Sequence, residues 1–434
     1  MSERRPAYVA RIARAMAAAW LAGPWTKADL MARGAACLGQ RPRWLETAAR
    51  WTLHSFPATP ELAAVVARLL RLPSFVLATS IAPLPRVVQV FFHQPPPAPA
   101  PWPTPQFDSV PQLASWLGID VNQLQWLADV RDWNRRDAHT RLHHYHPRWL
   151  AKRSGGERLV EVPKPELKRA QRLVLHRLLA HVPPHDAAHG FCRGRSVLTH
   201  AALHTGQAVV VRLDLTDFFS SVGRPQIRAI FAALGYNPAV AGTLAGLCTT
   251  ATPLTVLADR PLSWRQRQLF HRPHLPQGAP TSPALANLCA FSLDVRLTAL
   301  AAVFGARYSR YADDLTLSGG ADAARIAQRL VEWVALIAAQ CGFAVNHRKT
   351  AVRRQAVRQQ VCGIVVNQKP NLRRADVERL RAILTNCVRH GPHSQNRENH
   401  PQFRQWLEGH VSWVQAVNPG RGARLRALFE QISW

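Results

Sequence analysis

The feature that most constrains this chain is the segment 307–318, in which the adjacent aspartates Asp313 and Asp314 lie between two short runs of alternating apolar residues. Alternation with a period of two predicts β-strands, and a polar pair between the runs predicts a hairpin with both acids at its tip. Neighbouring carboxylates repel each other unless a cation lies between them. An Asp-Asp pair at a turn is common, so this segment alone does not define a metal site.

A third acid, Asp214, follows the apolar run 209–213, which is typical of a buried strand. Three carboxylates at the ends of two strands suit a pair of Mg²⁺ ions. Such ions lie about 3.5–4 Å apart and bind the attacking and leaving oxygens of a phosphoryl transfer. We therefore expect Asp214, Asp313 and Asp314 to be catalytic acids that bind metal ions.

Between these segments lies Pro-Gln-Gly-Ala-Pro-Thr-Ser-Pro, residues 276–283. The three blocks in this order resemble the palm motifs of reverse transcriptases, where an aspartate on a strand is followed by Gln-Gly and then by Tyr-x-Asp-Asp. The resemblance covers about residues 109–430. It implies an α+β right-hand polymerase fold with fingers, a palm built on an antiparallel sheet, and a helical thumb. It also implies RNA-directed DNA polymerase activity with dNTPs and two Mg²⁺ ions, or Mn²⁺ in their place.

The same resemblance assigns roles to individual residues. Asp214, Asp313, Asp314 and the backbone carbonyl of Leu215 would bind the metal ions. Phe219 would lie under the sugar of the incoming nucleotide and exclude a 2′-OH. The other residues expected near the nucleotide are Lys152, Arg158, Asp217, Phe218, Gln277, Gly278 and Lys349. The residues expected to contact nucleic acid are Arg193, Arg195, Val361, Gly363, Asn367, Arg379, Arg381 and Arg389. For Lys152 and Arg158, a general basic surface is an equal alternative.

Two further blocks, Gly-Phe-Cys-Arg-Gly-Arg-Ser at 190–196 and Gly-Ile-Val-Val-Asn at 363–367, resemble the reverse transcriptases of retrons. Retron enzymes usually carry Asn where this chain has His200, and Thr where it has Cys362. The retron resemblance implies a structured non-coding RNA as template and primer, and a branched RNA–cDNA hybrid (msDNA) as product. It also implies anti-phage defence with an effector protein. The alternatives are a reverse transcriptase of a group II intron or a diversity-generating element, or a non-catalytic RNA-binding scaffold.

Charge and cysteine usage are consistent with this interpretation. The net charge is +29, from 55 Lys and Arg against 26 Asp and Glu, which indicates a polyanionic partner such as nucleic acid. Seven dispersed cysteines without a Cys-x-x-Cys pair favour a reducing cytoplasm. No stretch is long and apolar enough to span a bilayer, so we expect no membrane partner.

Four regions are expected along the chain. Residues 1–93 alternate helical patterns with Pro and Gly breaks, which predicts a helical extension for packing or partner binding, with nucleic-acid contact as the second interpretation. Residues 94–108 form a proline-rich linker, expected to be an extended spacer. Residues 109–360 would hold fingers and palm, and residues 361–434 a basic helical thumb. The histidines of the segment 143–146 are expected to form a solvated or RNA-facing patch rather than a metal site.

Overall fold

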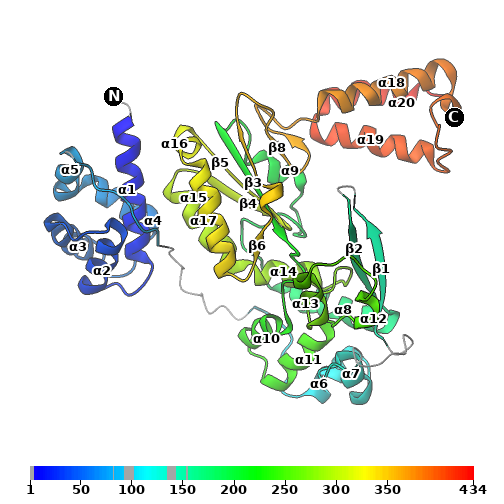
Figure 1. Ribbon diagram of the computed structural model, residues 1–434, viewed down its shortest axis with the longest axis horizontal. Helices are drawn as coiled ribbons and strands as arrows, with labels where there is room; N and C mark the ends of the chain where they lie inside the picture. The colour runs from blue at the N-terminus through cyan, green and yellow to red at the C-terminus, as the bar shows by residue number, and fades with distance from the viewer. Residues whose placement is uncertain (1–3, 82, 92–101, 134–142, 153–154) are drawn as a thin grey trace.

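The computed structural model describes residues 4–81, 83–91, 102–133, 143–152 and 155–434. A group of N-terminal helices lies on one side of a central sheet, and a C-terminal helical group extends from the other side (Figure 1). A long hairpin and several helices lie below that C-terminal group in the same view. This arrangement agrees with the expected α+β fold of fingers, palm and thumb preceded by a helical extension.

The N-terminal region consists of five helices, as the periodicity predicts. They are α1 (Arg4–Leu21), α2 (Lys27–Leu38), α3 (Arg43–Ser55), α4 (Leu62–Arg71) and α5 (Pro73–Ser80). Trp20 and Phe75 are fully buried between them. Helix α1 also packs against α15 (Phe291–Val303) of the palm. Because a single contiguous cluster of buried apolar residues includes both regions, the extension is anchored to the palm.

The proline-rich segment is only partly a spacer. Its residues 94–101 lie outside the described part of the chain, but residues 102–108 dock on the body of the protein. Phe107 is buried and stacks on Tyr236, with ring centroids 5.7 Å apart. The Tyr236 hydroxyl donates to the carbonyl of Pro105. The expected extended spacer therefore does not continue to residue 108.

The fingers contain a long antiparallel hairpin. Strands β1 (Tyr145–Ala151) and β2 (Glu157–Pro163) pair antiparallel, with Tyr145 opposite Pro163 and Ala151 opposite Glu157. At its base, Glu161 accepts hydrogen bonds from the Thr252 hydroxyl and from His274, at 2.7 and 3.0 Å. The helices around the hairpin are α6 (Val110–Leu117), α7 (Val121–Ala128), α8 (Pro165–Arg177), α10 (Arg224–Ala233), α11 (Pro238–Cys248), α12 (Leu254–Leu257) and α13 (Trp264–His271).

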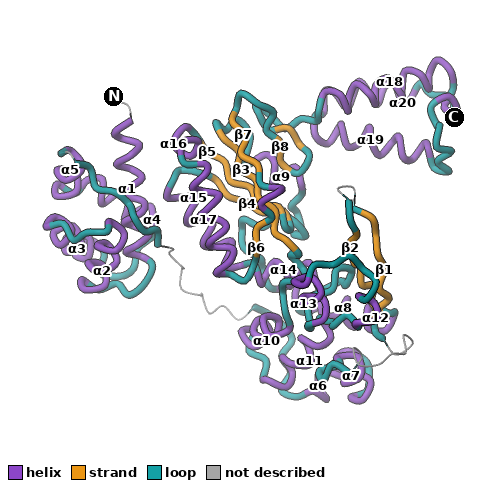
Figure 2. The backbone as a smooth tube through the Cα atoms, in the orientation of Figure 1, coloured by secondary structure: helices purple, strands orange, loops and turns teal. Residues whose placement is uncertain are grey.

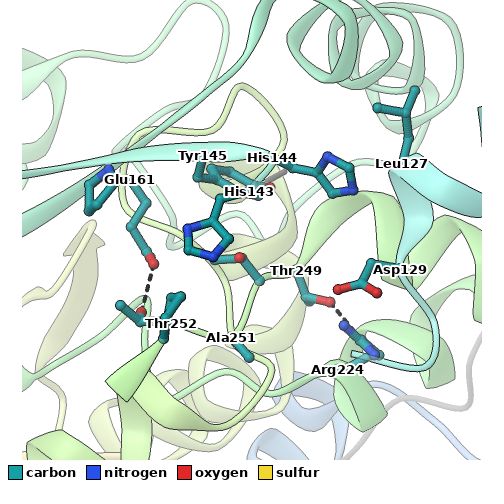
Figure 3. Close-up of a pocket in the computed structure, with 13 residues that line it drawn as sticks. Leu127, Asp129, His143, His144, Tyr145, Glu161, Arg224, Thr249, Ala251 and Thr252 are labelled. Carbon is teal, nitrogen blue, oxygen red and sulfur yellow. Dashed lines mark hydrogen bonds between the residues drawn. The ribbon is translucent and has the colours of Figure 1, made fainter. Parts of the chain in front are cut away.

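The expected solvated histidine patch is wrong for two of its members. His143 and His144 are only 6% and 5% exposed. Figure 3 shows both rings among the residues that line a cavity of about 30 Å³, which is room for about one water molecule. His144 Nε2 lies 2.6 Å from the Trp126 carbonyl, and burial lowers the pKa of His144. These rings pack the fingers together, whereas His146 is exposed.

The palm is a five-stranded sheet of order β4-β5-β3-β6, with β7 also paired to β3 (Figure 2). Its strands are β3 (Val209–Thr216), β4 (Arg307–Tyr311), β5 (Asp314–Gly319), β6 (Ala344–Val345) and β7 (Ala351–Arg354). Its helices are α9 (Val197–Ala202), α14 (Ser282–Cys289), α15, α16 (Ala321–Arg325) and α17 (Ala327–Gln340). Helices α16 and α17 are separated at Ile326. Helices α15 and α17 lie on the side of the sheet that faces the N-terminal helices.

The C-terminal region begins with a small ribbon, β8 (Gln360–Val361) and β9 (Ile364–Val365), whose two-residue turn is Cys362-Gly363. Three helices follow, α18 (Arg374–His390), α19 (Phe403–Val417) and α20 (Pro419–Glu430), with a separate apolar core. Within the described residues, no single helix is both long and apolar enough to cross a bilayer, although the bent pairs α4–α5 and α14–α15 each reach that length and composition together.

Candidate active site

The structure brings the three predicted acids together at one end of the palm sheet. Strands β4 and β5 form the predicted hairpin, with Ala312 and Asp313 at its tip. Asp214 of β3 lies directly opposite Asp314 of β5 in the antiparallel register. The Leu215 amide donates to the Asp313 carbonyl at 2.8 Å, which fixes the tip against β3. Residues paired in this way have Cα atoms about 4.5–5.5 Å apart, so Asp214 and Asp314 are close neighbours across the two strands.

Two cations contact these acids. The Lys349 ammonium donates to both carboxylate oxygens of Asp214, at 3.0 and 2.9 Å. Arg212 donates to Asp314 at 2.7 Å, and the Cys362 thiol donates to the same oxygen at 3.4 Å. Lys349 has a half-exposed side chain and can move away, whereas Arg212 is largely buried. Asp314 is therefore held by the protein itself more firmly than Asp214 is.

Asp313 has a perturbed carboxyl. Burial raises its pKa, and the negative charges of Asp214 and Asp314 raise it further. An approaching divalent cation would remove this penalty. The oxygen-only donor set fits Mg²⁺ or Mn²⁺. Within the described residues, however, no three acid, histidine or cysteine side chains are already arranged as a complete metal site. The carboxyl groups are of the type that binds a divalent ion and lie on neighbouring strands. In this structure, the Lys349 ammonium takes up both carboxylate oxygens of Asp214.

All the predicted nucleotide-binding residues except Gly278 border one cleft of about 820 Å³, which Asp214 and Asp313 also line and Asp314 does not. From the fingers it includes Lys152 and Arg158, both exposed. From the palm it includes Leu215, Asp217, Phe218, Phe219, Gln277 and Lys349. Phe218 is 4% exposed, whereas Phe219 is partly exposed and lies near Phe191, with ring centroids 6.0 Å apart. The pair therefore places the Phe218 ring in the core and the Phe219 ring at the cleft.

Gly278 has a structural requirement that the sequence did not indicate. Its φ is +135°, and a Cβ added there would lie 2.7 Å from the Glu161 carbonyl of β2. The Glu161 amide donates to the Gln277 carbonyl at 2.8 Å. A glycine is therefore needed to let the palm loop run alongside the fingers hairpin.

Several predicted nucleic-acid contacts are engaged within the protein. Arg195 donates to Asp186 at 2.9 Å and to the Ala188 carbonyl at 2.7 Å, which leaves Arg193 as the exposed arginine of that loop. Val361 is fully buried. The Asn367 side chain accepts from the Gln359 amide and donates to the Gln355 and Val357 carbonyls. Gly363 has a φ of +88° in the β8–β9 turn, and Arg379, Arg381 and Arg389 are exposed on α18.

A fully buried ion pair that the sequence analysis missed supports the acidic hairpin. Arg310 of β4 donates to both oxygens of Asp294 in α15, at 2.8 and 2.6 Å. It also donates to Asn287 and to the Ala312 carbonyl at the tip, both at 3.0 Å. The Tyr308 hydroxyl donates to Asp294 at 2.8 Å. The available signal was the acid Asp294 within a largely apolar helical segment, because a buried charge requires a partner.

A second buried network joins α9 to the same hairpin. His200 Nδ1 and His204 Nε2 each lie 2.7 Å from the Ser309 hydroxyl, and His204 Nδ1 lies 2.7 Å from that of Ser318. Both imidazoles are fully buried. Burial lowers the pKa of His200 to about 2 and that of His204 to about 3. Both rings are therefore neutral, and His200 contributes to core packing and hydrogen bonding.

Backbone strain is concentrated around the cleft. Of the seven described non-glycine residues with positive φ, four lie here, namely Phe191, Asp217, Ala312 and Cys362. Gly190 lies so close to the hairpin that an added Cβ would be 2.5 Å from the Ala312 amide. Strained conformations of this kind persist only where the surrounding structure enforces them, and they cluster at functional sites.

Comparison with known proteins gives a consistent result. Residues 150–368 match the family described as Reverse transcriptase (RNA-dependent DNA polymerase). The Retron Mx65 reverse transcriptase of Myxococcus xanthus is 40% identical over 317 residues, which is 72% of this chain and 69% of the relative. The Retron Mx162 reverse transcriptase of the same organism is 37% identical over 346 residues, 76% and 67% of the two chains.

The similarity extends to more distant relatives. The Retron Ec86 reverse transcriptase of Escherichia coli is 31% identical over 228 residues, 52% of this chain and 64% of the relative. Among solved structures, a Candida albicans telomerase with a fragment of telomeric RNA overlaps 65% of this chain and 54% of that chain. The overlap has 10% identity and a TM-score of 0.36, too low to add to the fold assignment.

Proposed function

Because this chain belongs to the reverse transcriptases of retrons, we propose that it copies a structured non-coding RNA into DNA that stays covalently joined to the RNA as a branched hybrid (msDNA). Membership of the family makes the chain an RNA-directed DNA polymerase of a retron, which takes an RNA template and nucleotides and depends on divalent metal. The branched product, the number of metal ions and the roles of individual residues belong to the proposal.

In the proposed mechanism, Asp214, Asp313, Asp314 and the Leu215 carbonyl would hold two Mg²⁺ ions. When bound, the ions supply charge stabilisation for phosphoryl transfer. Lys349, which is half-exposed, would be free to turn toward the nucleotide phosphates if Asp214 held a metal ion. Arg212 keeps Asp314 in one orientation, which reduces the reorganisation that metal binding requires.

The remaining cleft residues bind and select the nucleotide. Lys152 and Arg158 on the fingers hairpin contact the triphosphate, and Asp217, Phe218, Gln277 and Gly278 shape the nucleotide site. Phe219 lies against the sugar and excludes a 2′-OH by its bulk. Arg193, Arg195, Val361, Gly363, Asn367, Arg379, Arg381 and Arg389 position the template and the growing duplex, directly or by shaping the loops that contact it.

The observation that carries this proposal is the register of the palm, in which Asp214 faces Asp314 and Asp313 lies at the adjoining tip. The test is primer extension with dNTPs and Mg²⁺ on the RNA encoded just upstream of the gene. The wild-type chain should produce DNA that remains attached to RNA until a debranching enzyme is added. The Asp313→Asn/Asp314→Asn variant should produce none. No extension by the wild-type chain on any RNA template would contradict the proposal.

The comparisons favour the retron assignment over a group II intron or diversity-generating enzyme, since the relatives named above are retron enzymes. The three intact acids disfavour a non-catalytic scaffold. We further propose that the enzyme works in the cytoplasm, and that its product acts with an effector protein in anti-phage defence. Loss of phage resistance in cells that carry the Asp313→Asn/Asp314→Asn variant would support that role, and unchanged resistance would contradict it.

A further inference from the structure

Helix α8 has two chemically different faces. The side packed into the fingers carries the buried residues Leu167, Ala170, Gln171 and Val174. At about 100° per residue, the opposite side carries Lys168, Arg169, Arg172 and His176. Helical stripes of this kind normally mix both charge signs, but no acid lies among these four positions. The outer face of α8 is therefore a one-sign stripe.

This stripe borders a groove of about 740 Å³ at the base of the fingers hairpin. His146 of β1 lies on its other side, and Val162, Pro163 and Leu173 form an apolar floor. No carboxylate lines the groove in the part of the chain that the structure describes. In that same part, Arg169 and Arg172 are exposed and form no ion pair with an acid. Their charge is therefore uncompensated.

One face of the hairpin links this groove to the catalytic cleft. Arg158 is opposite Leu150, Arg148 is opposite Val160, and His146 is opposite Val162. Residues directly opposite, and those two apart along a strand, project on the same side, so these basic side chains share a face. Arg158 lines the cleft and His146 lines the groove. The four residue-to-residue steps from 150 to 146 span about 13 Å.

We propose that this surface, the basic track, binds the RNA template outside the catalytic cleft and holds the unpaired template ahead of the segment being copied. The track consists of Arg158, Arg148, His146, Lys168, Arg169, Arg172 and His176. A row of like charges without acids is unfavourable by itself and is relieved by a phosphate backbone. The apolar floor suits the sugars and base edges between phosphates. RNA fits better than an acidic protein because the track continues into the cleft where the template must enter.

The experiment rests on the proposed function for its choice of ligand but measures binding rather than catalysis. Two substrates are prepared from one DNA primer and RNA templates that leave about 12 or about 2 unpaired template nucleotides. At about 3.4 Å per nucleotide these reach about 41 Å and about 7 Å, so only the longer one passes the 13 Å run. Affinity is measured by fluorescence anisotropy without dNTPs, for the full chain and for Arg169→Gln/Arg172→Gln.

Each lost contact to a single-strand phosphate should lower the slope of log K against log salt by about 0.7, and should cost about fivefold in affinity near 0.1 M salt. The double variant should therefore bind the long-overhang substrate about 25-fold more weakly, with a slope reduced by about 1.4. Binding of the short-overhang substrate should not change. The matched control is Arg228→Gln/Arg329→Gln, which removes two exposed helical arginines of α10 and α17 and should change neither substrate.

If the double variant bound both substrates equally more weakly, or bound both as tightly as the wild-type chain, the proposal that the basic track binds template RNA would be overturned. Unchanged affinity for both RNA substrates would indicate that the surface binds a protein partner instead. These outcomes are separate from the proposed function. A wild-type chain that binds the long overhang through α8 but extends no primer would contradict polymerase activity and leave the track intact. Unchanged thermal midpoints of both double variants show that neither result comes from unfolding.

Discussion

The buried histidines of α9 and the turn that follows it, His200 and His204, predict a steep loss of local stability in mild acid. His200 and His204 have folded pKa values of about 2 and about 3, against 6.5 when the segment opens to water. A pKa lowered by folding means that the open state binds more protons below pH 6.5. The α9–hairpin contact is therefore fully stable above that pH and weakens as pH falls toward 3. The charged neighbours Arg212 and Arg307 disfavour imidazolium further.

The size of the destabilisation follows from how far the solution pH lies below the open-state pKa of the histidines. At pH 5 each histidine lies about 1.5 units below its open-state pKa, which corresponds to about 2 kcal/mol. This is about a 30-fold increase in the opening equilibrium for each ring, or about 1,000-fold for both. The assay is hydrogen–deuterium exchange of peptides that cover α9 and the β4–β5 hairpin, at pH 7.5 and 5.0, after correction for intrinsic exchange rates. A local measurement is needed because a chain of this size does not unfold in one step.

The matched control is His200→Asn, which keeps a polar partner for Ser309 but cannot titrate. Its protection factors should fall about 30-fold between the two pH values, against about 1,000-fold in the wild-type chain. Other histidines with a lowered pKa, such as His189, contribute equally to both proteins and cancel in the difference. The reasoning is refuted if the two proteins show the same pH dependence in these peptides.

Three further predictions concern the site. Arg310→Met should lower the free energy of unfolding by about 3–5 kcal/mol, because it leaves the Asp294 carboxylate buried without its arginine partner. The double variant Arg310→Met/Asp294→Leu should regain most of this stability. Denaturant titration measures both variants, and a double variant as unstable as the single one would contradict the pairing. Phe219→Val should raise ribonucleotide over deoxynucleotide incorporation about 10- to 200-fold in single-nucleotide extension, and unchanged selectivity would remove its sugar-gate role. Lys349→Gln should tighten Mn²⁺ binding to the nucleic-acid-free chain by about two- to fivefold, because the half-exposed Lys349 competes for Asp214; weaker binding in a calorimetric titration would contradict that competition.

The sequence predicted the palm because its signals are local. Period-two alternation and a polar turn define the β4–β5 hairpin, and the side-chain period fixes which residues share a face. Once β3 pairs with β5, Asp214 and Asp314 must meet. The fingers hairpin and α8 were predictable for the same reason, since glycines at a turn and a helical stripe require no knowledge of distant segments.

The features that could not be predicted depend on tertiary partners. His143 and His144 are polar in composition, but packing around β1 buries them. The Arg310–Asp294 pair joins a helix to a strand, and neither residue indicates its partner. Lys349 was expected at the nucleotide, and its contact with Asp214 follows from how β6 and the turn after it lie beside β3. In each case the sequence specified a residue type, and the fold specified its neighbour.

The central claim, that three acids from two separate segments share one divalent-ion site, is tested most directly by metal-directed cleavage. Fe²⁺ is bound in place of Mg²⁺, and peroxide with ascorbate then cuts the backbone nearest to the ion. The account predicts two cuts, one beside Asp214 and one beside Asp313 and Asp314, with both lost in Asp214→Asn. Cuts at only one of these segments, or a cut at the β4–β5 hairpin that survives Asp214→Asn, would contradict it.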